Sequence, residues 1–84
     1  MPYILPDDRP KYDTLLKLMP QFKTVGELNY FISNLCQQYI EENGESYTNY
    51  NALVGVLECI KLELYRRKIS IYEDKKLSQN GDVY

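Results

Sequence analysis

The chain contains no histidine and no tryptophan, and it has only two cysteines and four glycines among its 84 residues. The absence of histidine excludes serine and cysteine triads with an imidazole base, most zinc sites and histidine-based acid–base catalysis. The cysteines, Cys36 and Cys59, lie in apolar helical patterns without a Cys-x-x-Cys spacing, so we expect two buried, reduced thiols. A disulfide between them is geometrically conceivable across a helical hairpin, whereas a cytoplasmic setting favours free thiols.

Long apolar runs and an excess of positive charge are also missing. Every stretch without a charged residue is shorter than the roughly 18 residues that a membrane span needs, and Met1–Asp8 lacks the basic start and apolar run of a signal peptide. Ten Lys and Arg against twelve Asp and Glu give a net charge of −2, which removes the broad positive field of a general nucleic-acid binder. We therefore expect a cytoplasmic protein whose main partner is neither a membrane nor a nucleic acid.

The length and composition fit one small globular domain. A mass of 10.0 kDa allows a single domain, and 44% hydrophobic with 26% charged residues is ordinary for a folded chain. A chain this short buries only about 60% of its unfolded surface, so its stability is marginal without help. We expect one helical domain over 1–84, with an extended arm over 1–7 and a tail over 78–84.

Hydrophobic periodicity predicts the first two helices. Apolar residues at i, i+3, i+4 and i+7 predict a short amphipathic helix over 8–19, which Pro20 ends. Thr24 and Glu27 have the spacing of a capping box, which predicts the start of a second helix over 25–42. Gly44 supplies the left-handed exit that ends this helix.

A third and longer helix follows the second after a short loop. Ser46 or Thr48 can cap it, and its pattern continues at least to Lys68, about 30 Å at 1.5 Å per residue. The short loop predicts that the second and third helices form an antiparallel hairpin in an all-α, three-helix fold. Ser70 and Glu73 repeat the capping-box spacing, so the helix either continues or breaks; we favour a break or kink near Ser70 and a short fourth helix to about residue 77. Asn80 and Gly81 then mark a turn before a partly ordered tail.

The third helix carries two apolar seams. The inner seam follows alternating three- and four-residue steps and predicts the hairpin core; its members are Tyr50, Leu53, Leu57, Ile60, Leu64 and Ile71. At 100° per residue a second series lies on nearly the opposite side. We name this series the outer seam, and its members are Gly55, Glu58, Leu62, Tyr65 and Ile69. Two short helices hardly cover both sides of so long a helix, so the outer seam predicts an oligomer interface.

Two outer-seam residues sharpen this interpretation. Gly55 costs about 0.5 to 1 kcal/mol in a helix interior, a cost commonly retained where two backbones approach closely. Glu58 needs a partner in a dry seam, and Arg66 of an antiparallel second copy can supply it. The alternative is that the outer seam is covered by the tail or by the N-terminal arm, in which 3–5 is an apolar triplet.

A basic cluster at the end of the third helix is the candidate ligand site. Its members are Lys61, Tyr65, Arg66, Arg67 and Lys68. Cations beside an aromatic ring can hold a phosphate or stack a base, so a small anionic ligand or a nucleotide at a subunit junction is one reading. The other reading is a solvated face, because cations are favoured at a helix C-terminus and Glu63 pairs with Arg67 at i, i+4. Nine tyrosines favour an interaction surface.

The sequence marks no catalytic group and no metal or cofactor site. The acidic residues Glu41, Glu42 and Glu45 lack the regular oxygen-ligand spacing of a calcium loop. The other carboxylates of the long helix occupy no identifiable cleft, and no nucleophile stands out. We therefore expect no enzyme, no cofactor and no metal.

Most of the chain resembles a known but uncharacterised family. The strings 1–4 and 26–30, the central run 55–59 and 61–67, and the closing runs 72–76 and 80–84 are similar to a family of small proteins from prokaryotes and their phages. The resemblance implies a compact helical protein without an established activity, in which the stretch from Glu58 to Arg67 and the tail are recurring features. A phage setting would imply a role in countering or tuning host machinery.

The interpretation that accounts for most of these features is a non-enzymatic interaction module. Such a module forms a homo-oligomer through the outer seam and binds a protein partner, in a regulatory or phage/host-related role. The alternative is an oligomeric binder of a small anionic ligand, in which Glu58, Tyr65, Arg66 and Arg67 of adjacent chains converge.

Overall fold

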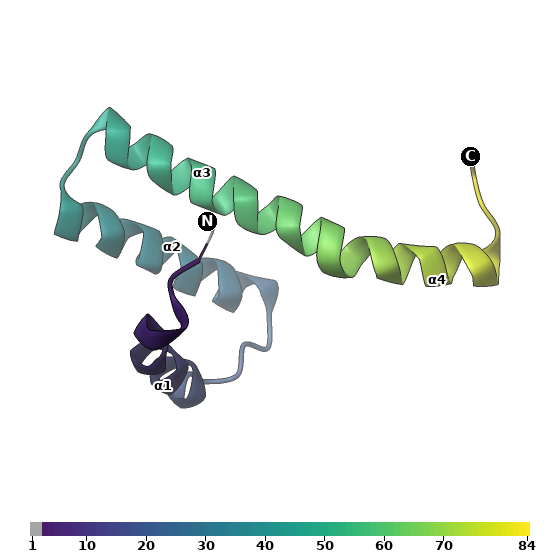
Figure 1. The fold of residues 1–84 in the computed structure, drawn as a ribbon, viewed down its shortest axis with the longest axis horizontal. Helices are drawn as coiled ribbons and strands as arrows, with labels where there is room; N and C mark the ends of the chain where they lie inside the picture. Colours follow the sequence, from purple (N-terminus) through teal and green to yellow (C-terminus); the bar gives the residue numbers. More distant parts are fainter. Residues whose placement is uncertain (1–2) are drawn as a thin grey trace. The chain divides into compact units, whose positions relative to one another are not determined.

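A computed structural model describes residues 3–84 of the chain and shows an all-α protein (Figure 1). Its elements in order are the 3₁₀ turn η1 (Pro6–Asp8), the helices α1 (Pro10–Leu18), α2 (Val25–Asn43) and α3 (Tyr47–Leu64), the π-helical turn η2 (Tyr65–Ile69) and the helix α4 (Ser70–Asn80). No strand occurs in residues 3–84, so the predicted fold class is confirmed. Within this range no helix is both long enough and apolar enough to cross a membrane.

The chain divides into two compact units, Met1–Asn49 and Tyr50–Tyr84. The first holds α1, α2 and the start of α3, and the second holds the rest of α3 with η2, α4 and the tail. Each unit is described by itself below. The antiparallel packing of the second and third helices and the single domain over 1–84 therefore stay predictions.

The first helix begins two residues later than the periodicity predicts. Residues Pro6–Asp8 form the 3₁₀ turn η1, in which the Asp8 N–H donates to the Leu5 carbonyl at 3.0 Å and the Arg9 N–H to the Pro6 carbonyl at 3.2 Å. Pro10 has no N–H to donate back to Pro6, so a regular α-helix starts only there, where proline is well tolerated. Of the predicted arm, residues 1 and 2 lie outside the described range.

The second helix starts as the capping box predicts. The Glu27 N–H donates to Thr24 Oγ1 at 3.1 Å, and the Thr24 N–H donates to Glu27 Oε2 at 2.9 Å, so both reciprocal bonds form. The rings of Phe22 and Phe31 lie 5.3 Å apart at 49°, which fixes the chain entering the helix against its second turn. The predicted start of α2 is thus confirmed.

The loop between α2 and α3 is fixed by side-chain bonds to backbone. Gly44 has φ 99° and ψ 150°, a conformation that only glycine adopts without strain. Ser46 Oγ accepts from the Asn49 N–H at 3.1 Å, so Ser46 rather than Thr48 caps α3. The Asn49 side chain donates to the Asn43 and Gly44 carbonyls at 3.1 and 2.8 Å. These bonds satisfy carbonyls that the end of α2 leaves free.

The second unit is one continuous helical rod followed by a short tail (Figure 1). Of the break or kink predicted near Ser70, a break does not occur, because Leu64, Ile69 and Ser70 all have right-handed helical dihedrals. The predicted fourth helix does begin at Ser70. The regular α-helix ends at Leu64, and the π turn Tyr65–Ile69 joins it to α4. Helix α4 continues to Asn80, so only residues 81–84 extend beyond it.

Among the described residues none is buried. The side chains with intermediate exposure are Met19, Phe22, Phe31, Cys36, Ile40, Asn49, Leu53, Glu63 and Ile69. The prediction of two buried thiols is therefore wrong: Cys59 is exposed, Cys36 has intermediate exposure, and both thiols are free. The apolar pattern of a helix identifies a face that favours burial, but it does not show that anything covers that face.

Candidate functional site

The outer seam lies on the exposed surface of the rod in the second unit. Leu62 and Tyr65 expose 57% and 52% of their surface, and the side chain of Glu58 exposes 53%. A Cβ atom built on Gly55 would meet no atom within 4 Å beyond the adjacent residues and backbone of its own helix, so no other part of the chain requires glycine there. Along this part of α3, the seam is thus an apolar strip with one carboxylate and one glycine.

The π turn moves two predicted seam residues. In a π turn each N–H bonds five residues back, so the turn holds about one residue more than an α-helical turn. Here the Ser70 N–H donates to the Tyr65 carbonyl. Residues after Tyr65 are therefore rotated back relative to a regular helix, and Ile69 leaves the outer seam toward the inner side. The same rotation takes Ile71 off the inner seam and puts Tyr72 there.

The rotation, and not exposure, separates these residues. Ile69 has intermediate exposure, but Ile71 and Tyr72 are both exposed. The placement of Ile69 in the outer seam and of Ile71 in the inner seam is therefore corrected. The continuous 100° step that produced both placements fails at the π turn.

Ser70 follows the π turn, and its hydroxyl bonds backward to the turn. Its N–H is diverted to the Tyr65 carbonyl, which would leave the Arg66 carbonyl without its usual α-helical donor. Ser70 Oγ replaces that donor with a hydrogen bond of 2.8 Å to the Arg66 carbonyl. The sequence interpretation missed this role because it assigned the hydroxyl to a forward cap, although the run 65–69 contains no helix breaker.

Two cations of the basic cluster are paired within the chain. Lys61 Nζ lies 3.0 Å from Glu58 Oε1, and Arg67 Nη1 lies 2.8 Å from Glu63 Oε1. The first is an i, i+3 pair and the second the predicted i, i+4 pair. In residues 3–84 we find no hydrogen bond or ion pair to the guanidinium of Arg66 or the ammonium of Lys68. In a single chain, Arg66 and Lys68 are therefore the two cations available to an anion, whereas Lys61 and Arg67 contact carboxylates.

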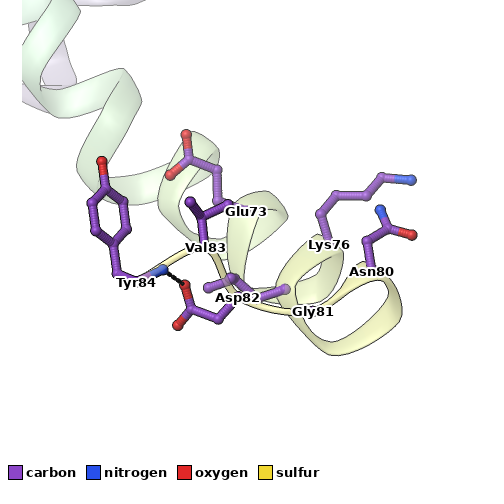
Figure 2. Close-up of a pocket in the computed structure, with 8 residues that line it drawn as sticks. Glu73, Lys76, Asn80, Gly81, Asp82, Val83 and Tyr84 are labelled. Carbon is purple, nitrogen blue, oxygen red and sulfur yellow. Dashed lines mark hydrogen bonds between the residues drawn. The ribbon is translucent and has the colours of Figure 1, made fainter.

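A shallow open depression of about 400 Å³ lies at the end of the rod (Figure 2). Gly81 has φ 87° and turns the chain out of α4, and the tail then lines the depression together with Glu73, Lys76, Leu77 and Asn80 of the helix. The Tyr84 N–H donates to Asp82 Oδ1 at 2.9 Å, an Asx turn that orders the tail locally. Val83 and Tyr84 remain almost wholly exposed. The depression holds no recognisable set of catalytic or ligand-binding groups.

The first unit has a second open depression beside the start of α2. It is lined by Pro20, Gln21, Phe22, Gly26, Glu27, Tyr30 and Phe31. Its one carboxylate, on Glu27, already accepts from the Lys23 and Thr24 N–H groups and the Thr24 hydroxyl. This depression is therefore a consequence of how α2 is capped. Elsewhere in residues 3–84, no three cysteine, aspartate or glutamate side chains gather where they could hold a metal ion.

Comparisons with known proteins give a family and no activity. No curated protein and no solved structure matches the chain. A family model described as a domain of unknown function (DUF6899) matches residues 1–83. This match covers nearly the whole chain, including the outer seam, the π turn and most of the tail. The chain therefore belongs to the DUF6899 family, whose function is unknown.

Proposed function

We propose that the protein is a non-enzymatic interaction module that forms a homo-oligomer through the outer seam of α3 and binds a protein partner in that form. The observation that carries the proposal is the exposed apolar strip of the rod, in which Leu62 and Tyr65 expose 57% and 52% of their surface. The rod of the second unit has no other helix in its own unit, so nothing there covers its apolar faces.

The exposed apolar side chains of the rod support association. Leu62, Tyr65 and Ile71 each expose more than half of their surface. Stable interfaces bury about 800 Å² on each partner, and obligate homodimers bury more. An interface along the rod would cover such side chains.

The nature of the exposed side chains supports a protein partner. Tyr30, Tyr47 and Tyr72 expose more than half of their surface, and tyrosine is enriched in protein interfaces. The anion-binding alternative has less support, because Lys61 and Arg67 already contact carboxylates. The protein-binding function is therefore the one that we carry forward.

The mass of the protein in solution tests the proposal. Size-exclusion chromatography with light scattering should give a wild-type mass above 10.0 kDa. Leu62→Glu and Tyr65→Glu should shift that mass toward the monomer, because each places a carboxylate in the apolar strip. Val25→Glu is the matched control, since it makes the same apolar-to-acid change at an exposed position on α2. A monomeric wild type that both seam variants leave unchanged would contradict the proposal.

A further inference from the structure

We infer that the partner at the outer seam is a second copy of this chain in antiparallel orientation, with Leu62 on the two-fold axis and Glu58 paired with Arg66 of the second copy. This inference rests on the proposed function and specifies the geometry of the same interface. In a two-fold interface, if one residue contacts another across the axis, the second also contacts the first. Glu58 and Arg66 each lie four residues from Leu62, so they satisfy this condition about Leu62.

The charge pattern selects the antiparallel orientation. With Leu62 on the axis, Glu58 faces Arg66 of the second copy and Lys61 faces Glu63, so both pairs have opposite charges. A parallel pair of identical helices would instead bring each charge beside its own copy, and like charges side by side are unfavourable. The order of charges along α3 and η2 is thus self-complementary only when the second helix is reversed.

The π turn keeps Arg66 near the seam. Because the turn holds more residues than an α-helical turn, the rotation from Tyr65 to Arg66 is smaller, and Arg66 lies closer to the direction of Leu62 than in a regular helix. The same turn rotates Ile69 away. The bond from Ser70 Oγ to the Arg66 carbonyl fixes the backbone of the residue whose side chain would cross the interface.

The two charged groups retain the capacity for this pair. Glu58 contacts Lys61 through Oε1 at 3.0 Å, which leaves a second carboxylate oxygen for another donor. A guanidinium presents its donors in a planar fork that matches a carboxylate. In the part of the chain that the structure describes, no hydrogen bond or ion pair engages the Arg66 guanidinium. Glu58 would then lie between one lysine of its own chain and one arginine of the second copy.

Gly55 completes the geometry. It lies seven residues before Leu62, so in the antiparallel arrangement it faces the π turn of the second copy. A helical glycine without any neighbour in its own chain allows another backbone to approach closely. The π turn of one copy and Gly55 of the other therefore lie opposite each other in the interface.

A charge exchange between copies tests the inference. Sedimentation over a concentration series should show that Glu58→Arg and Arg66→Glu each raise the dissociation constant of the dimer, by roughly tenfold or more, because each places like charges together in both pairs. An equimolar mixture of the two variants should recover the dimer, since the heterodimer has one Arg–Arg chain facing one Glu–Glu chain. Lys75→Glu is the control, because it reverses a charge in α4 that lies outside both pairs, thirteen residues after Leu62, and it should leave the mass unchanged.

The outcomes separate this inference from the proposed function. If Leu62→Glu dissociates the dimer but the charge variants do not, or their mixture fails to recover it, the antiparallel pairing is overturned and self-association stands. A monomeric wild type overturns both. Should either single variant lose helical circular dichroism, the double variant E58R/R66E decides, because it restores both opposite-charge pairs and should dimerise like the wild type.

Discussion

Two segments of this chain have the same capping-box spacing and different structures. Thr24 and Glu27 form both reciprocal bonds and start α2. Ser70 and Glu73 form neither cap bond: Ser70 Oγ bonds backward to Arg66, and the backbone stays helical through Ser70. The two motifs differ in the residues that precede them. Pro20 ends one helix before Thr24, whereas the residues before Ser70 are helical and contain no breaker. The motif therefore starts a helix only where the preceding backbone is free to leave helical geometry.

A proline placed directly after the first residue of each motif should give the largest difference in stability. Ile71→Pro should destabilise the protein by about 3 kcal/mol or more, since residue 71 lies inside a continuous helix. Val25→Pro should change stability little, because residue 25 is the first residue of α2 and Thr24 before it is extended. Urea unfolding at equal protein concentration measures both. If Ile71→Pro is as mild as Val25→Pro, a new helix starts at Ser70 in solution.

Removing each hydroxyl should give a smaller difference. Thr24→Ala should cost about 1 kcal/mol, the usual value for loss of an N-cap. Ser70→Ala should not show this loss, because alanine favours helix interiors. It should instead remove the donor to the Arg66 carbonyl and return 65–69 to α-helical geometry, which carbon chemical shifts report. Equal destabilisation by the two alanine variants would contradict the assignment of Ser70 to the π turn.

Neutralising each glutamate should give the smallest difference. Glu27→Gln should cost about 0.3 to 1 kcal/mol, because the carboxylate lies at a helix N-terminus and accepts from the Lys23 and Thr24 N–H groups. Glu73→Gln should leave stability unchanged within error, since no free helix N-terminus lies beside it. Thermal unfolding monitored by circular dichroism is sufficient. A larger loss in Glu73→Gln than in Glu27→Gln would reverse the comparison.

The sequence was enough to place α2 and the start of α3. These boundaries depend on local chemistry that the residues express directly: Thr24 with Glu27 at one end, Gly44 at the other, and Ser46 before the next helix. The π turn could not be predicted in the same way. It is defined by the Ser70 N–H donating to the Tyr65 carbonyl, and no residue in the run 65–69 marks such a turn in the sequence.

The candidate site stays a prediction. Gly55, Glu58 and Leu62 belong to α3 and Tyr65 begins η2, so the periodicity that puts them on one strip applies to a regular helix up to Leu64. Ile69 does not lie on that strip, because the π turn alters the angle between successive residues. Periodicity does not show whether another part of the chain covers a face, which is why Cys59 was expected to be buried and is exposed. The oligomer and its partner stay predictions.

One side chain, that of Asn49, spans the ends of two helices. Its amide donates to the carbonyls of Asn43 and Gly44 while its own N–H donates to Ser46 Oγ. Opening the last turn of α2 therefore releases a group that also stabilises the first turn of α3, and the reverse holds as well. The amide hydrogens on both sides of the loop should consequently exchange with solvent as one cooperative unit rather than as two independently fraying ends.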